Sequence, residues 1–243
     1  QVLEGDIDHG PASPFALMDF EREEGKCLAC CAMPESDIVI EADIDEEPDA
    51  RRIPLQDFNG KIVKIENLTP TIKGIFIELE DDTGMDFQAG QYVNVHLPMG
   101  DEVLTRAFSL SNAPHERILE LNVRLVPGGR GTTYLHESLQ EGDDLTISGP
   151  FGRFFVRKSQ PENLLFLAGG SGLSSPKSMI LDLLEADKDP RHITLVYGAR
   201  TRKELYYHDL FTKLAEEHTN FTYVPALSEA PAEGDHWEGK CGF

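Results

Sequence analysis

Long apolar segments are missing from this chain of 243 residues. No run approaches the roughly 18–20 consecutive apolar residues that a membrane-spanning helix needs, so we expect no membrane partner. The opening stretch, QVLEGDIDHG, has neither the basic start nor the apolar core of a secretory signal peptide. We therefore expect neither a membrane span nor a secretory leader.

Positive charge is scarce. The chain has 22 Lys and Arg residues against 43 Asp and Glu, which gives a formal net charge of −21 at pH 7. This negative charge repels phosphate backbones, so nucleic acid is not expected as a partner. The acidity suits docking on a basic protein surface, but it also simply keeps a protein soluble, and we favour the second interpretation.

Cysteine is rare, and three of the four cysteines, Cys27, Cys30 and Cys31, crowd into one pentapeptide. This is not the disulfide framework of a secreted domain, so a reducing cytoplasm is the expected location. The spacing allows a redox pair, a zinc half-site or an iron–sulfur ligand. A zinc or cluster site needs four ligands, and Cys241 lies far away, so we favour two structural cysteines beside one special one.

Motifs of hydrolytic catalysis are also absent. The sequence contains no G-x-S-x-G, no H-E-x-x-H and no paired-carboxylate signature, and its histidines show no metal-ligand spacing. These motifs therefore assign no catalytic residue.

The pattern of residues changes three times along the chain. Residues 1–45 mix a short predicted helix with a strand, and residues 46–55, which are acidic, then basic, and carry two prolines, indicate a linker. Residues 56–158 contain short alternating strands bounded by Gly, Pro, Asn or Asp, which predict an antiparallel β-barrel or sandwich. Residues 159–243 alternate buried strands with amphipathic helices, which predicts a doubly wound α/β domain with three strands, fewer than usual.

A glycine-rich turn gives the sharpest local signal. It lies in the stretch LFLAGGSGLSSPKSMI, where a buried strand ends in Gly169-Gly170-Ser171-Gly172 and a helix follows. Glycines let the backbone approach a ligand, and a helix N-terminus favours phosphate, so a nucleotide site is predicted. The alternative is an ordinary tight turn. Arg200 and Arg202 follow the second parallel strand, where they would meet an adenosine ribose or a 2′-phosphate, or form a solvated loop.

The predicted β-domain carries a second set of candidates. Arg106, Phe108 and Ser109 start one strand, and an arginine can clamp phosphate, an aromatic ring can stack on a planar ring, and a hydroxyl can bond a ring nitrogen. The stretch Gly128–Thr132 precedes the single helical piece of this domain and suits an anion. The alternatives are a surface arginine and a phenylalanine of the core.

A family resemblance rests on four stretches: RAFSLS, VRLVPGGRGTTYLHE, SGPFGRFF and FLAGGSGLSSPKSMILDLLE. They resemble the ferredoxin–NADP reductase superfamily, and within it the reductase components of multicomponent phenol hydroxylases. The stretch FALMDFEREEGKCLACCAMPESDIVIEADIDEEPDA is similar to the ferredoxin segment and linker of the same reductases. The resemblance implies a remnant of a β-grasp [2Fe–2S] ferredoxin domain, an FAD-binding β-barrel and an incomplete NAD(P)H-binding α/β domain.

The resemblance also implies roles for single residues. It assigns Arg106 to the FAD diphosphate, Phe108 to stacking on the isoalloxazine and Ser109 to a bond near flavin N5. Val123 and Arg124 would lie near the flavin through backbone and charge. The family has tyrosine where Phe108 stands, so one hydroxyl contact is lost while stacking is retained.

Two further groups follow from the same resemblance. Gly129 and Thr132 match the pattern that binds the FAD diphosphate. The nicotinamide-dinucleotide loop is matched by Gly170, Ser171, Gly172 and Leu173.

The chain departs from the family pattern at both ends. Cys30 takes the place of the family's fourth cluster ligand, and the first three would precede residue 1. The family's Cys-Gly-Pro-Pro stretch would lie beyond Phe243, and Cys241 is too early to belong to it. We therefore expect an internal fragment of a longer reductase, with the [2Fe–2S] cluster present only in the full-length parent.

The predicted function is that of an NAD(P)H-dependent flavin oxidoreductase, the reductase subunit of a phenol 2-monooxygenase. It would pass electrons from NADH or NADPH through FAD, and in the parent through [2Fe–2S], to the oxygenase component. One alternative is a flavin- or nucleotide-binding module without turnover because of truncation. A second alternative is an acidic, cysteine-based metal-binding protein.

Overall fold

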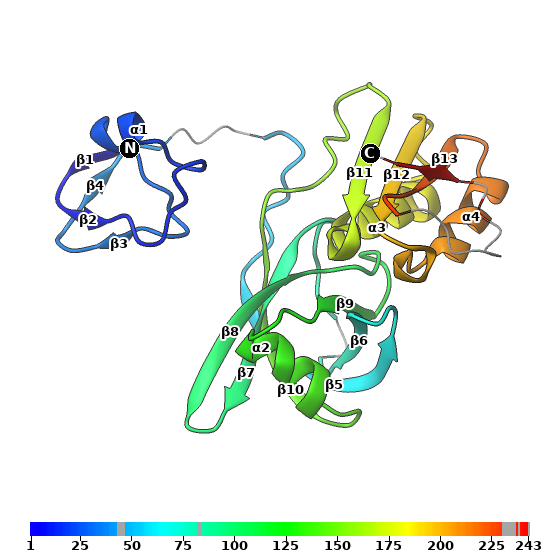
Figure 1. Cartoon of the computed structure of the whole chain (residues 1–243), viewed down its shortest axis with the longest axis horizontal. Coiled ribbons are helices and arrows are strands. Elements are labelled where there is room, and N and C mark those ends of the chain that lie inside the picture. The colour runs from blue at the N-terminus through cyan, green and yellow to red at the C-terminus, as the bar shows by residue number, and fades with distance from the viewer. Residues whose placement is uncertain (43–46, 82–83, 230–236, 238, 243) are drawn as a thin grey trace. The chain divides into compact units, whose positions relative to one another are not determined.

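The computed structural model describes residues 1–42, 47–81, 84–229, 237 and 239–242. The chain forms two compact units, Gln1–Pro48 and Asp49–Phe243 (Figure 1). No helix in the described ranges is both long and apolar enough to cross a membrane.

The first unit consists of short elements. Strand β1 (Val2–Glu4) pairs antiparallel with β4 (Val39–Ile40), β2 (Ile7–Asp8) pairs with β3 (Met33–Pro34), and α1 covers Asp19–Glu23. Among its apolar side chains Leu17 is buried, whereas Phe15 is 96% exposed. A segment of this size buries little core, which agrees with the short strands.

The second unit begins with an antiparallel barrel sheet. Its strands are ordered β8-β7-β10-β5-β6-β9 in the described residues. A bridge between Leu110, just after β8, and Leu121 of β9 joins the two edges of the sheet. The single helical piece predicted for this domain is a short α-helix followed by a π-helical turn. The bounds are β5 (Gln56–Asn67), β6 (Ile72–Leu79), β7 (Tyr92–Met99), β8 (Glu102–Ser109), β9 (Ile118–Arg124), α2 (Arg130–Thr133), η1 (Tyr134–Ser138) and β10 (Asp144–Phe151).

Apolar side chains at alternate positions along the strands fill the interior of the barrel. On β9, Leu119, Leu121 and Val123 point into the barrel core, whereas Glu120 and Asn122 face the other way. The predicted antiparallel barrel is therefore confirmed, and β9 shows the alternation that fills it.

The α/β domain follows the barrel. Its parallel sheet has the order β11-β12-β13-β14 in the described residues, so a short fourth strand joins the three that were predicted. The stretch ELYYHDLFTKLAEEH predicts a second helix that begins at Glu204, but the helix begins at His208. The bounds are β11 (Leu164–Gly169), η2 (Gly170–Leu173), α3 (Ser174–Leu181), η3 (Asp182–Asp187), β12 (Ile193–Ala199), η4 (Arg202–Glu204), α4 (His208–Glu217), β13 (Phe221–Leu227) and β14 (Lys240–Cys241).

Both described helices of this domain cover the same face of the sheet. Parallel strands added in one direction through right-handed crossovers place their helices on one side. Phe166 and Leu195 on that side pack in one core with α3 and α4. On the opposite side of β11, Leu165 and Leu167 are exposed.

The segment expected as a linker belongs in part to the second unit. The Asp49 carboxylate accepts hydrogen bonds from Ser159, at 3.1 Å from its backbone nitrogen and 2.5 Å from its hydroxyl. The Gln88 side chain donates to the carbonyl of Asp49 and accepts from the backbone nitrogen of Arg51. Polar side chains therefore attach residues 49–51 to the barrel and to the stretch that follows it.

Candidate functional site

The glycine-rich turn forms η2, a 3₁₀ turn between β11 and α3. Gly170 has a φ of +52°, which favours glycine, and side chains added at Gly170 or Gly172 would meet nothing within 4 Å. Its backbone is therefore open to a ligand. Leu173 is fully buried, so its side chain anchors the turn in the core. The Ser171 carbonyl accepts a hydrogen bond from the Ser174 hydroxyl.

A cavity of about 350 Å³ opens beside this turn, between the barrel and the α/β domain. It brings together three residues predicted from the sequence, namely Arg124 at the end of β9, Gly170 in η2, and Arg200 after β12. The remaining lining residues come from the β5–β6 connection and the start of β6, from the carboxyl ends of β12 and β13, from η4 and from the end of β14: Thr69, Thr71, Ile72, Gly198, Ala199, Glu204, Ala226, Leu227, Ser228 and Gly242. Carboxyl ends of parallel strands are where α/β sheets bind ligands.

Arg200 does not extend freely into this cavity. Its guanidinium donates to both carboxylate oxygens of Glu204, at 3.2 Å and 2.5 Å. The hydrogen bond from Arg200 holds the pKa of Glu204 below its usual range, so the pair is charged at neutral pH. Arg202, the second predicted arginine, is exposed on η4 and does not line the cavity.

The predicted flavin motif lies at the end of β8, not at the start of a strand as expected, because β8 already begins at Glu102. Arg106 is exposed, and its stem lies against the start of α2, since a side chain added at Gly131 would come within 3.0 Å of Arg106 Cγ. Phe108 is partly buried and packs against the barrel core, so part of its ring is used by the interior. Ser109 is partly buried, opposite Tyr92 of β7.

The predicted diphosphate residues form the turn that enters α2. Gly129 is the N-cap and Thr132 lies within the helix, so this helix begins at Arg130 and not after Thr132 as expected. The Thr132 hydroxyl accepts from the Val126 backbone nitrogen and donates to the Gly129 carbonyl. A side chain added at Gly129 would come within 2.8 Å of that hydroxyl, so close packing explains why this position is a glycine. Val123 is fully buried, and its carbonyl is in contact with His136 Nε2 at 2.8 Å. Thr132 and Val123 thus have structural partners of their own.

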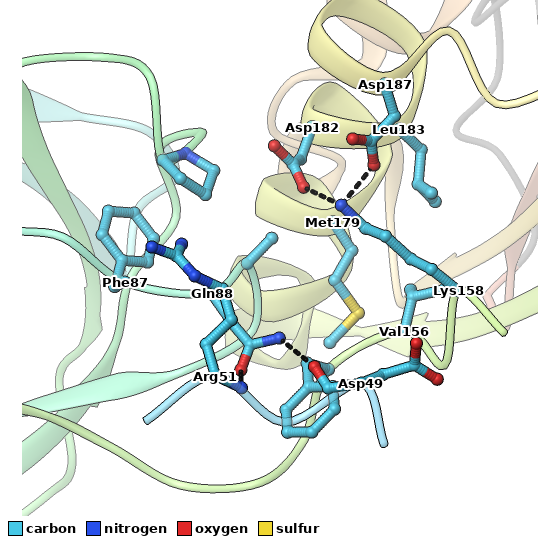
Figure 2. A pocket seen from close by; sticks show the side chains of 13 residues that line it. Asp49, Arg51, Phe87, Gln88, Val156, Lys158, Met179, Asp182, Leu183 and Asp187 are labelled. Atoms are coloured by element: carbon cyan, nitrogen blue, oxygen red, sulfur yellow. Dashed lines mark hydrogen bonds and ion pairs between the residues drawn. The ribbon is translucent and has the colours of Figure 1, made fainter. Parts of the chain in front are cut away.

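A different cavity, of about 380 Å³, lies where the barrel, residues 155–158 and the α3–η3 helix meet (Figure 2). None of the predicted site residues lines it. Its Lys158 forms ion pairs with Asp182 and Asp187. Burial lowers the pKa of Lys158, but the two carboxylates outweigh it and the net direction is upward. Lys158 is therefore paired with two carboxylates of the cavity wall, whereas Arg51 pairs with Asp86 outside the lining.

The cysteine cluster lies in the first unit. Cys30 is exposed, and its Sγ lies 3.7 Å from Cys31 Sγ. The hydrogen bond with Cys30 raises the pKa of the Cys31 thiol. Among the described residues no three His, Cys, Asp or Glu side chains are grouped as metal ligands. A cluster-ligand role for Cys30 stays a prediction.

The sequence did not point to one prominent feature, a buried polar network that joins the barrel to α3 and α4 through Lys177, Glu120 and Tyr207. The sequence does contain an indication of this network, because Lys177 lies on the apolar face of its helix with Ile180, Leu181 and Leu184. A charge at such a position needs a buried partner.

Comparisons with known proteins agree with this architecture. Residues 59–156 match the family model of the oxidoreductase FAD-binding domain, and residues 166–243 match that of the oxidoreductase NAD-binding domain. The chain is 55% identical to the phenol hydroxylase P5 protein of Acinetobacter pittii over 244 residues. It is 56% identical to the reductase component of phenol 2-monooxygenase from a Pseudomonas species, again over 244 residues. All of this chain and 67% of each relative are covered.

Solved structures show the same fold. A cytochrome P450 reductase of Amycolatopsis superposes with a TM-score of 0.78 at 31% identity, covering 100% of this chain and 71% of that one. The ferredoxin reductase of a carbazole 1,9a-dioxygenase gives 0.74 at 25% identity, covering 100% and 70%. The predicted barrel and α/β modules and their FAD and NAD cofactors are confirmed by these matches. The chain belongs to the ferredoxin–NADP reductase superfamily, within the reductase components of phenol hydroxylases.

Proposed function

We propose that the chain carries a hydride from NADH or NADPH to FAD in the reductase component of a phenol hydroxylase. In the longer protein the electrons then pass through a [2Fe–2S] cluster to the oxygenase component. The observation that carries the proposal is the cavity in which Arg124 of the barrel meets Gly170 of the nucleotide turn. The names of the relatives support an oxygenase component as the partner. The closely spaced free cysteines support a location in the reducing cytoplasm.

The residues present fit both cofactors. The space beside Gly170 and Gly172 lets the backbone approach a dinucleotide phosphate. Arg106 lies exposed beside the start of α2, where its guanidinium can bind an FAD phosphate. Arg124 is exposed at the wall of the cavity and adds positive charge in an otherwise acidic chain.

The chain's own residues bind and orient. When bound, FAD supplies the redox chemistry, taking a hydride and releasing single electrons. We assign diphosphate binding to Arg106 and to the Gly129 turn, with Thr132 holding that turn in shape. Phe108 and Ser109 orient the ring, with Val123 supporting it from β9. Arg124 offsets negative charge beside the nucleotide turn, and Leu173 anchors that turn in the core.

An anaerobic addition of NADH to the purified chain, loaded with FAD and followed by visible absorbance, tests the proposal. Loss of the flavin band within seconds is the expected result, and NADPH is run in parallel to compare the nucleotides. A flavin that stays bound but oxidised would leave a binding module without turnover. Failure to retain any flavin would contradict the assignment of Arg106, Phe108 and Ser109.

A further inference from the structure

An ion pair is buried where the barrel meets the α/β domain. Lys177 of α3 and Glu120 of β9 place Nζ and Oε2 2.7 Å apart, with side chains only 5% and 7% exposed. Removing two charges from water is unfavourable, so such a pair persists only when further bonds satisfy both groups. The surroundings of the pair therefore decide its role.

Both groups are well satisfied. The Lys177 ammonium also donates to the Ser111 carbonyl at 3.0 Å and lies 4.6 Å from the centre of the Tyr207 ring. The second carboxylate oxygen of Glu120 accepts the Tyr207 hydroxyl at 2.6 Å. Lys177, Glu120 and Tyr207, called the clamp below, thus form a closed set of contacts across the domain junction.

Tyr207 is held in an unusual backbone conformation. Its φ of +58° lies in the left-handed region that a bulky residue rarely adopts, at the residue that precedes α4. Such strain persists only where the surroundings impose it. Burial, together with the charge of Glu120, raises the pKa of the Tyr207 phenol, so the hydroxyl remains a donor. The hydroxyl and ring contacts of the clamp supply the constraint.

The clamp joins the two elements that bear the proposed site. Glu120 and Arg124 lie on the same face of β9, and Arg124 lines the cavity. Lys177 lies four positions after Leu173, on the helix that follows the nucleotide turn. A second contact supports the junction, since the Ser178 hydroxyl donates to the Asn112 carbonyl at 2.6 Å. The clamp therefore fixes β9 relative to the nucleotide turn.

We propose that Lys177, Glu120 and Tyr207 are positioning residues that set the nicotinamide loop against the flavin barrel for hydride transfer. The inference rests on the function proposed above. The clamp touches neither the cavity nor the flavin motif, so it acts through the placement of Gly170 and Arg124. Its loss should leave FAD binding intact and slow the chemical step.

The first test is Tyr207→Phe, which removes one hydroxyl and keeps the ring. The FAD dissociation constant should stay within about twofold, while flavin reduction by NADH in a single turnover should slow about 10-fold to 100-fold, because small misplacements of reacting groups are this costly. Amide hydrogen exchange of the FAD-free protein should rise in β9 and α3. The matched control is Tyr223→Phe, whose hydroxyl bonds His208 within the α/β domain and does not reach the barrel.

Glu120→Gln provides the second variant, and the double variant with Tyr207→Phe measures their coupling. Members of one network should combine non-additively. Equal reduction rates and equal exchange in the variants and the native chain would overturn the proposal. Loss of folding or of FAD binding in both variants would overturn it as well, in favour of a purely structural pair. If the native chain itself is not reduced by NADH, the proposed function fails, and the exchange data alone then decide whether the clamp orders the junction.

Discussion

At the scale of single residues, we predict that the charge of Arg106 contributes to how tightly the barrel holds FAD. Arg106 is exposed on β8, the strand of the flavin motif, and its Cγ lies beside Gly131 of α2. Arg106→Met should weaken FAD binding about 10-fold to 100-fold, the range of a lost charge-assisted hydrogen bond. Fluorescence titration of FAD measures the change. Lys61→Met is the control, since Lys61 on β5 pairs with the exposed Asp144, and an equal loss there would contradict a specific role.

We predict that Glu204 is a second residue with a measurable effect, on the choice between NADH and NADPH. A 2′-phosphate approaching Arg200 must displace the Glu204 carboxylate, which already takes two of its hydrogen bonds. We predict a preference for NADH, and Glu204→Gln should raise relative kcat/KM for NADPH about 10-fold, because it frees the guanidinium.

The matched control for this prediction is Glu217→Gln. Glu217 pairs with Lys213 over the same spacing of four residues, on the exposed side of α4. An unchanged ratio of NADPH to NADH use in the Glu204 variant would contradict the prediction. A change of the same size in the control would point to general charge rather than to the Arg200 pair.

At the scale of elements, we predict that Gly170 in the turn η2 serves a ligand as well as the fold. Gly170 has a positive φ and open space around it, so Gly170→Ala should destabilise the protein by only about 1 kcal/mol. The added methyl group should nevertheless stand where a dinucleotide approaches and raise the dissociation constant of NADH. Gly100→Ala, in the turn between β7 and β8, has the same open space and a φ of +70°. It should cost similar stability and leave NADH binding unchanged, as urea unfolding and NADH titration will test.

The elements also show where sequence patterns fall short. The pattern from Glu204 onward predicts one continuous helix, but α4 begins at His208. The reason is tertiary, since Tyr207 leaves helical geometry while its side chain contacts Glu120 of the barrel. The strand β14 was not predicted. Its two residues are too few to show a pattern, and they form a strand because the fold places them beside β13.

At the scale of the whole molecule, carboxylates with lowered pKa predict acid sensitivity. Hydrogen bonds from Ser159 lower the pKa of Asp49, and those from Arg191 lower the pKa of Asp189. Because the folded-state pKa lies below the unfolded value, this stability is present above the unfolded pKa and is lost as pH falls through the folded one. The urea midpoint of the second unit should therefore hold from neutral pH to about 5 and fall below about 4.

Asp189→Asn tests the acid prediction directly. Arg191 binds Asp189 with both side chains 9% exposed, and also donates to the Gln160 carbonyl at 2.7 Å. The variant should lower the urea midpoint at pH 7 and flatten its decline toward acid, whereas Asp101→Asn, in the exposed turn between β7 and β8, should change neither. A decline that stays as steep in the Asp189 variant would place the acid-labile groups elsewhere.

The sequence by itself determined the order of the modules and the kind of site they carry. Periods of two and of 3.6 residues distinguish barrel strands from helices, and the glycines of residues 169–172 mark an open backbone turn, because both signals are local. The tertiary structure alone decided which distant residues meet. Lys177 and Glu120 are separated by 57 positions, and Arg124 reaches the cavity of Gly170 only because the barrel packs against α3. Such contacts depend on how whole modules pack, and no local pattern encodes that packing.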